Sequence, residues 1–115
     1  MSDSRLADLL EQMGGSAGDA LSFVEGMGKE EFLGDKRTQH AVVMCLQIIG
    51  EAAKKVLDGF PEFVALRPEI RLEEMRGIRN RIAHGYVLID QERVWDTVQE
   101  DLPVLIEQVE ESLRD

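Results

Sequence analysis

Hydrophobic residues recur at intervals of three and four along most of the chain, a period typical of amphipathic α-helices. The first such segment spans residues 6–27. We expect one helix there, because the hydrophobic phase continues across Gly14-Gly15 even though each glycine weakens a helix. The sequence Gly26-Met27-Gly28 ends this segment, and residues 29–33 can add one further turn.

The second helical segment follows Asp35, which is well placed to cap it, and ends at Asp58-Gly59. Met44, Cys45 and Ile48 widen its hydrophobic surface beyond a single stripe. We therefore expect this helix to be buried on more than one side.

A third long helix is predicted after a short one that lies between two prolines, Pro61 and Pro68. It should begin near Ile70 and end just before Gly85. We expect Gly85 to adopt the left-handed conformation that commonly follows a helix.

The last predicted helix is capped by Asp90, and its hydrophobic phase continues through Pro103, so we expect a kink there rather than a chain reversal. No alternating strand pattern and no internal repeat is present in the sequence. Four main helices with short connections predict an all-α fold. Its form is an antiparallel four-helix up-down bundle with short extra helical turns, in a single domain of residues 1–115.

Composition narrows the class of protein further. The chain has 13 basic and 23 acidic residues, a net charge of −10, and 43% hydrophobic residues, which is too many for a disordered acidic chain. No hydrophobic run approaches the roughly 20 residues that span a bilayer, and the first residues lack the pattern of a signal peptide. We expect a cytoplasmic protein that does not bind membranes.

Basic residues gather in one segment, Arg67 to His84, which holds five arginines and three glutamates. The rest of this acidic chain holds 8 basic and 20 acidic residues. Guanidinium groups bind phosphate with paired hydrogen bonds, so the segment is a candidate RNA-binding surface. The candidate phosphate ligands are Arg71, Arg76 and Arg81. A solvated helix face with Glu-Arg pairs is the alternative.

The residues 77–86 within this segment hold the groups that metal-free RNA cleavage requires. His84 can take the proton from a ribose 2′-hydroxyl, and Arg79 can stabilise the negative charge on the attacked phosphate. On a regular helix these two residues lie about 140° apart, whereas Asn80 and His84 share a face. Arg79 can join His84 only if the helix ends before His84 or if a second subunit supplies its own copy.

Other residues that could carry chemistry are assigned structural roles. His40 is interpreted as an isolated surface or capping histidine, the unpaired Cys45 as a small buried hydrophobic residue, and Trp95 as part of the core. The sequence contains no phosphate-binding glycine loop, dinucleotide fingerprint, zinc helix or calcium loop. We expect no metal and no cofactor.

The pattern Arg79-Asn80-x-x-x-His84-x-Tyr86 resembles the Arg-x4-His-x-Tyr motif of HepT-like toxins, members of the HEPN superfamily of helical ribonucleases. The likeness covers roughly residues 32–105. It includes Thr38-Gln39, residues 46–52, Pro68-Glu69-Ile70, Val94-Trp95 and Asp101-Leu102-Pro103.

This resemblance implies a function and partners. It implies a HEPN-like bundle that forms a homodimer with both motifs at the interface, and a metal-independent endoribonuclease that acts on tRNA or mRNA. It assigns catalysis to Arg79, Asn80 and His84. It also implies a type VII-like toxin-antitoxin system, in which a nucleotidyltransferase antitoxin, MntA, transfers AMP to Tyr86, the single tyrosine of the chain.

Two other hypotheses remain open from the sequence. The bundle could be a non-catalytic module that docks a nucleotidyltransferase or a nucleotide, with the arginines serving recognition alone. It could also be a structural dimer whose arginines form intersubunit salt bridges.

Overall fold

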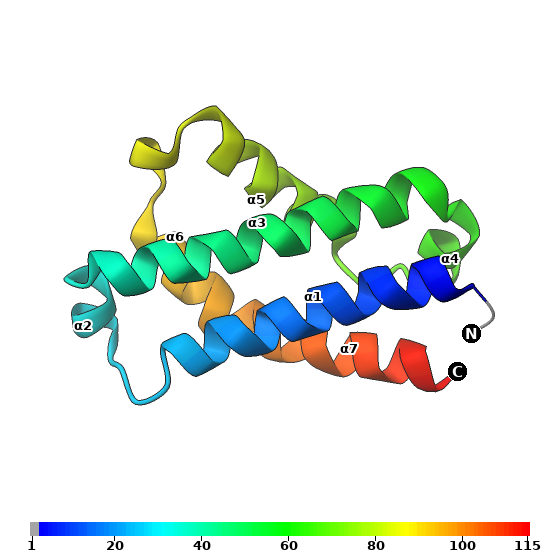
Figure 1. Cartoon of the computed structure of the whole chain (residues 1–115), viewed down its shortest axis with the longest axis horizontal. Coiled ribbons are helices and arrows are strands. Elements are labelled where there is room, and N and C mark those ends of the chain that lie inside the picture. Colours follow the sequence, from blue (N-terminus) through cyan, green and yellow to red (C-terminus); the bar gives the residue numbers. More distant parts are fainter. Residues whose placement is uncertain (1–2) are drawn as a thin grey trace.

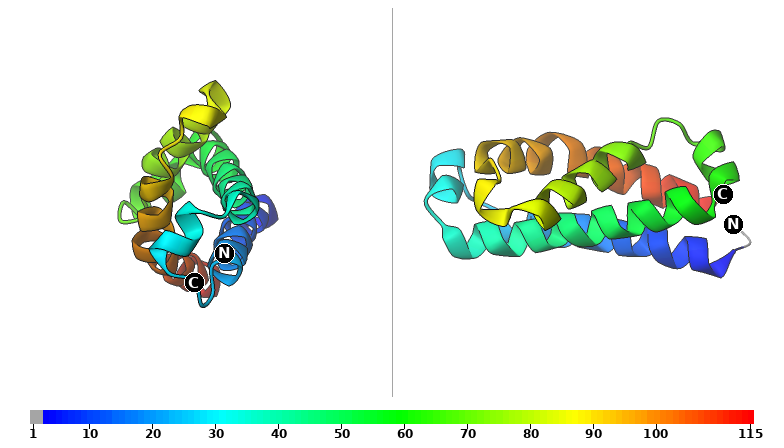
Figure 2. Two further views of the ribbon diagram at one scale, coloured as in Figure 1. Left: turned by 90° about the vertical axis from the view of Figure 1, so that its left-hand side faces the viewer. Right: turned by 90° about the horizontal axis from the view of Figure 1, so that it is seen from above.

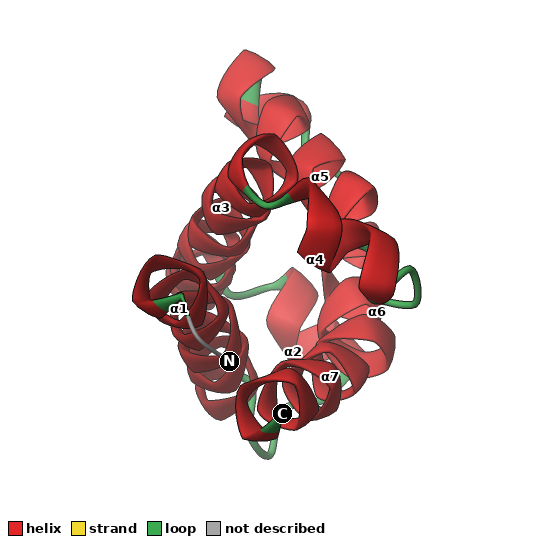
Figure 3. Cartoon of the chain, turned by 90° about the vertical axis from the view of Figure 1, so that its right-hand side faces the viewer, coloured by secondary structure: helices red, strands yellow, loops and turns green. Residues whose placement is uncertain are grey.

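The computed structural model describes residues 3–115, apart from the side chain of Val87. The helices in chain order are α1 (Ser4–Phe23), α2 (Lys29–Leu33), α3 (Lys36–Gly59), α4 (Pro61–Leu66), α5 (Leu72–His84), the 3-10 helix η1 (Tyr86–Leu88), α6 (Gln91–Asp96), the π-helix η2 (Thr97–Asp101) and α7 (Leu102–Arg114). Figure 3 shows helices and loops and no strand over the described part of the chain. The predicted all-α fold is therefore confirmed.

The four long helical segments alternate in direction. In Figure 1, α1 and α5 run towards one end of the molecule, and α3 and the continuous segment α6–η2–α7 run back. The two views in Figure 2 show the same elongated arrangement from its end and from above, and its extents are 43 × 29 × 20 Å. The predicted domain 1–115 includes Met1 and Ser2, which lie outside the described residues, and the single-domain assignment stays a prediction.

One hydrophobic core lies between these helices, and every long segment contributes buried side chains to it. These side chains include Leu10, Met13, Phe32, Val42, Leu46, Ile49, Val98 and Leu102. Cys45 is also buried, as predicted, and burial raises the pKa of its thiol, with the charge of Asp19 adding to the effect. Trp95 is half-buried and packs against Phe32 with ring centroids 5.4 Å apart.

Aspartates cap three helices, and each accepts backbone N–H groups that the first helical turn leaves unpaired. The Asp35 carboxylate accepts from the Thr38 amide at 3.1 Å and from its hydroxyl at 2.7 Å, and these bonds lower the pKa of Asp35. Asp90 accepts from the amide of Glu92 at 3.0 Å. Both caps were predicted, whereas the cap at Asp3 was not.

Two helix boundaries differ from the prediction. The first helix crosses Gly14-Gly15 without a break, as expected, but it ends at Phe23 rather than near Met27. The chain turns at Gly26, the one described residue with positive φ (80°). The third long helix begins at Leu72, two residues after the expected Ile70.

The helical path continues through Pro103, as predicted, and its irregularity is the π-helix η2, which ends at Asp101, two residues before that proline. Proline has no N–H to donate, so the local hydrogen bonding must rearrange. The amide of Leu102 donates to the carbonyl of Thr97, five residues earlier.

The α3 helix packs against α1 and against α5, so it is buried on more than one side, as predicted, but the surface of Met44 and Ile48 stays uncovered within one chain. Met44 and Ile48, which lie one turn apart, are 56% and 39% exposed, so the prediction that they are buried is wrong for the isolated chain. Adjacent exposed hydrophobic side chains of this kind often mark contact surfaces. Among the described residues, no helix is long and hydrophobic enough to cross a membrane.

Candidate active site

The predicted catalytic residues lie on the last two turns of α5, and Tyr86 lies in η1 immediately after it. The connecting residue Gly85 has φ −178° and ψ 85°, which is extended backbone. The expected left-handed conformation of Gly85 is therefore wrong. Its amide still closes the last helical turn by donating to the carbonyl of Arg81 at 3.2 Å, and the chain then enters the short 3-10 turn.

Arg79 is positioned by the close approach of α5 to α3. At Gly50 of α3, an added Cβ would lie 2.3 Å from the Cβ of Arg79 and 2.7 Å from the carbonyl oxygen of Met75. Only glycine allows the two backbones to come this close. The glycine thus places Arg79 directly beside the next α3 residue, Glu51.

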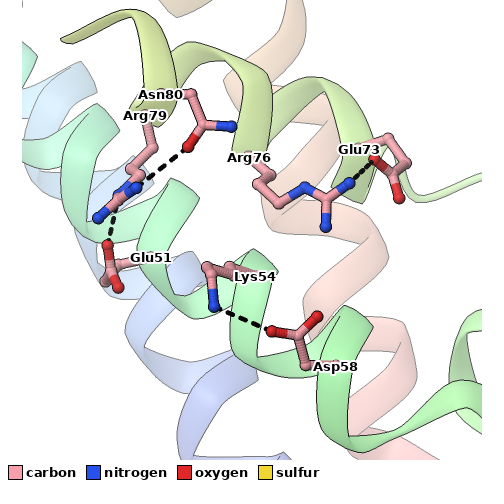
Figure 4. Close-up of polar contacts among 7 residues, drawn as sticks. All are labelled: Glu51, Lys54, Asp58, Glu73, Arg76, Arg79 and Asn80. Carbon is pink, nitrogen blue, oxygen red and sulfur yellow. Dashed lines mark hydrogen bonds and ion pairs between the residues drawn. The ribbon is translucent and has the colours of Figure 1, made fainter. Parts of the chain in front are cut away.

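Two hydrogen bonds fix the Arg79 guanidinium, as Figure 4 shows. Its Nε donates to the Glu51 carboxylate at 2.6 Å, and its Nη1 donates to the Asn80 side-chain oxygen at 3.1 Å. The Arg79 side chain keeps 29% of its surface exposed, so its remaining N–H groups can still meet a phosphate. Glu51 was not predicted to belong to the site, although it lies in the family-like segment 46–52, directly after Gly50.

His84 is exposed, and its orientation defines which ring nitrogen can act as a base. The Nδ1 atom lies 2.9 Å from the main-chain oxygen of Asn80. A carbonyl oxygen only accepts, so Nδ1 carries the proton in the neutral imidazole. The Nε2 atom is then unprotonated and can take a proton from a 2′-hydroxyl.

The structure keeps Arg79 and His84 on different sides of α5. The helix continues through His84, so the first of the two expected ways of joining them, an earlier helix end, is wrong. Asn80 contacts both residues, through its side chain to Arg79 and through its carbonyl to His84. A phosphate beside His84 therefore cannot also meet Arg79 of the same chain, and a second subunit is the source of Arg79 that the sequence left open.

Tyr86 is half-buried, and its hydroxyl oxygen is fully enclosed without a hydrogen-bond partner among the described residues. This burial raises the pKa of the phenol, because removal from water disfavours the charged phenolate. The edge of the ring meets His40 of α3, with ring centroids 5.0 Å apart and ring planes at 69°. The interpretation of His40 as an isolated histidine is therefore wrong; it is exposed but borders the site. No spacing in the sequence links residues 40 and 86.

The three arginines predicted to bind RNA differ in how their charge is used. Arg71 pairs with Glu74 at 2.6 Å and with Asp101 at 3.8 Å, and Arg76 pairs with Glu73 at 2.5 Å. Arg81 forms no ion pair with any described residue. Of the three, Arg81 has the charge most available to a phosphate.

A helical bundle that presents a histidine with a free Nε2 on the same helix as an arginine and an asparagine has the groups of a ribonuclease. A family model described as "Ribonuclease HepT-like" matches residues 13–112. The chain therefore belongs to the HepT-like ribonuclease family, and it is an endoribonuclease by that membership.

Individual relatives agree with this family assignment. "Putative RNase MJ1216" of Methanocaldococcus jannaschii is 34% identical over 110 residues, covering 96% of this chain and 85% of its own length. "Putative RNase MJ0127" of the same organism is 36% identical with the same coverage. "Probable ribonuclease HepT" of Thermococcus cleftensis is 45% identical over 66% of each chain. No solved structure gave a significant match.

Proposed function

We propose that this endoribonuclease is the toxin of a type VII-like toxin-antitoxin system and acts in the cytoplasm on tRNA or mRNA. His84 serves as the proton-transfer residue, Arg79 as the ligand that stabilises the attacked phosphate, and Asn80 as the residue that orients both. The observation that carries the proposal is the free Nε2 of His84, which the hydrogen bond from Nδ1 to Asn80 leaves available as a base.

The proposed cleavage needs no metal. His84 removes the proton of a ribose 2′-hydroxyl, and the resulting oxygen attacks the adjacent phosphorus. The 5′-oxygen of the next nucleotide leaves and takes up a proton, which gives a 2′,3′-cyclic phosphate and a free 5′-hydroxyl. Arg79 stabilises the additional negative charge on the phosphate in the transition state.

A homodimer is part of this proposal. Met44 and Ile48 form an exposed hydrophobic pair on α3, the helix that also carries His40 and Glu51 beside the motif. Burying this pair against a second copy would remove hydrophobic surface from water and bring two motifs together. The Arg79 of one subunit can then face the His84 of the other.

The antitoxin is proposed to be an MntA-like nucleotidyltransferase that transfers AMP to Tyr86. The added phosphate places negative charge two residues from His84 and repels RNA. Because the Tyr86 hydroxyl is enclosed, transfer requires that η1 move away from His40. Tyr86→Phe keeps the ring packing and removes the acceptor, so a cell that makes this variant should not be rescued by the nucleotidyltransferase.

The main test is expression of the wild type and of His84→Ala without a partner. Arg114→Ala, an exposed site on the last turn of α7, serves as the control. We expect the wild type and the control, but not His84→Ala, to arrest growth and to leave cut RNA with 2′,3′-cyclic phosphate ends. If folded, dimeric wild type cuts no RNA, catalysis by His84 is refuted and a non-catalytic module that docks a nucleotidyltransferase or a nucleotide takes its place.

A further inference from the structure

A groove of about 810 Å³ lies between α5 and α6, beside the proposed catalytic residues. It arises because α5 packs on α3 and η1, whereas α6 packs on α2 and η2, so the two helices diverge. His84 and Gly85 line one end of this groove, and Leu46 of α3 contributes to its lining. The volume lies within the roughly 300–1,000 Å³ of small-molecule sites.

Some charged side chains around the groove form ion pairs with one another, and others do not. Its four acidic residues are Glu73, Glu74, Asp90 and Asp101. Glu73 pairs with Arg76, and Glu74 and Asp101 both pair with Arg71. Asp90 caps α6. The two arginines that line the groove, Arg81 and Arg93, form no ion pair with any residue the structure describes. The guanidinium groups of Arg81 and Arg93 are therefore free to meet a phosphate, although the groove as a whole carries no net positive charge, because its lining holds four acidic residues and two arginines.

The Arg81 side chain lies along the groove because α5 has no side chain at Gly77. Its Nη1 atom lies 3.7 Å from the position that a Cβ of Gly77 would occupy. Arg93 approaches from α6, on the opposite wall. Guanidinium groups from two elements that converge on one groove favour a phosphate ligand over an isolated surface charge.

The groove also has a hydrophobic part. Ile78, Leu88 and Ile89 line it, and Leu88 is 87% exposed. The Leu88 side chain folds back over Gly85, with its Cδ1 3.6 Å from the position of a Cβ there. A flat heterocyclic base can cover this hydrophobic surface while the attached phosphate meets the arginines.

We propose that this groove binds the nucleotide next to the scissile phosphate of the RNA substrate. Arg81 and Arg93 bind the flanking phosphate, and the Leu88 surface accepts the base. Arg81 and His84 are three positions apart, about 4.5 Å along α5, so the flanking phosphate lies beside the reacting one. The proposal deepens the ribonuclease function and rests on it, and it adds Arg93, which no motif identifies.

Substrate length provides the kinetic test. A dinucleoside monophosphate has the scissile phosphate alone, whereas a trinucleotide adds a flanking phosphate on its 5′ or 3′ side. We expect the wild type to show about a tenfold lower KM for one of the two trinucleotides than for the dinucleotide. Arg93→Ala and Arg81→Ala should each bring this KM ratio close to one, and Arg93→Lys should restore part of it. The matched control Arg114→Ala should retain the wild-type ratio.

A binding test separates this proposal from the cleavage mechanism. A nucleoside 3′,5′-bisphosphate has no phosphodiester bond to cut, and its binding to the His84→Ala protein can be measured by titration calorimetry. We expect binding that Arg81→Ala or Arg93→Ala weakens about tenfold, with a smaller salt dependence. If neither variant changes this binding, or if both match Arg114→Ala in the KM ratio, the groove proposal is overturned. Binding without any RNA cleavage by wild type would refute the ribonuclease proposal alone.

Discussion

The contact between α3 and α5 at Gly50 offers the sharpest test of how the fold positions Arg79. In Gly50→Ala, the new Cβ would lie 2.3 Å from the Cβ of Arg79 and 2.7 Å from the Met75 carbonyl oxygen. Ordinary contacts begin near 3.4 Å, so these atoms must retreat by about 1.1 Å and 0.7 Å. Neither atom is the end of a flexible side chain, so α5 itself must move.

The expected change in the free energy of unfolding of Gly50→Ala is the sum of two opposing contributions. Overpacking of this kind costs about 1–3 kcal/mol, whereas alanine gains about 0.5–1 kcal/mol over glycine inside a helix. Gly18→Ala in α1 isolates the second term, because an added Cβ there meets no atom within 4 Å. We expect Gly18→Ala to stabilise the protein and Gly50→Ala to destabilise it.

Urea unfolding at one fixed protein concentration measures both variants, since subunit association would otherwise shift the midpoint. The difference between the two glycine variants gives the cost of the clash alone, about 1–3 kcal/mol. Gly50→Ala should also lower kcat for RNA cleavage, because a shift of about 1 Å in a positioned group can cost roughly 100-fold. Equal stabilisation by both alanines would refute the close approach of α3 to α5.

Three further predictions concern other groups of the molecule. The Tyr86 phenol should ionise above pH 10.0 in the native protein and at pH 10.0 after unfolding, so the stability of the fold should decrease as pH rises through this range. Tyrosinate absorbance measures this ionisation, and His40→Ala should return the native pKa towards 10.0. Glu51→Ala should lower kcat roughly 10- to 100-fold with a smaller change in KM, since Arg79 loses its acceptor, and Glu51→Gln should keep more of the activity. Because its pKa is lowered, the Asp35 carboxylate stabilises the fold above pH 3.8, and this stabilisation is lost as pH falls further. Asp35→Ala should therefore lower the urea midpoint at neutral pH and make that midpoint decline less in acid.

The helices could be predicted from the sequence because their signals are local. Hydrophobic periodicity and the caps at Asp35 and Asp90 depend on residues within a few positions of one another. The end of α5 could not be predicted in detail, because the extended conformation of Gly85 depends on the following 3-10 turn. The helix end near Met27 was also misplaced, since hydrophobic phase continues into the turn where Val24 still packs on the core.

The partners of the motif residues were beyond sequence reasoning for a different reason. Helical geometry alone separated Arg79 from His84, and the structure agrees. The contacts from Glu51 to Arg79 and from His40 to Tyr86, however, join residues 28 and 46 positions apart in the sequence. Such contacts depend on the packing of α3 against α5 and η1, and no spacing rule encodes them.

The separation of Arg79 and His84 on α5 makes subunit mixing the most informative experiment on the complete site. If each site combines Arg79 of one subunit with His84 of the other, a mixed dimer of Arg79→Ala and His84→Ala chains contains one site with both groups intact. Random pairing makes half of the dimers mixed, and in each mixed dimer one of the two sites is intact. About a quarter of the wild-type activity should therefore return. Each single variant by itself should stay inactive. Dimers of chains that each carry both substitutions should also stay inactive. If each site lies within one chain, no mixed dimer has an intact site and mixing restores nothing, which would refute a site shared between subunits.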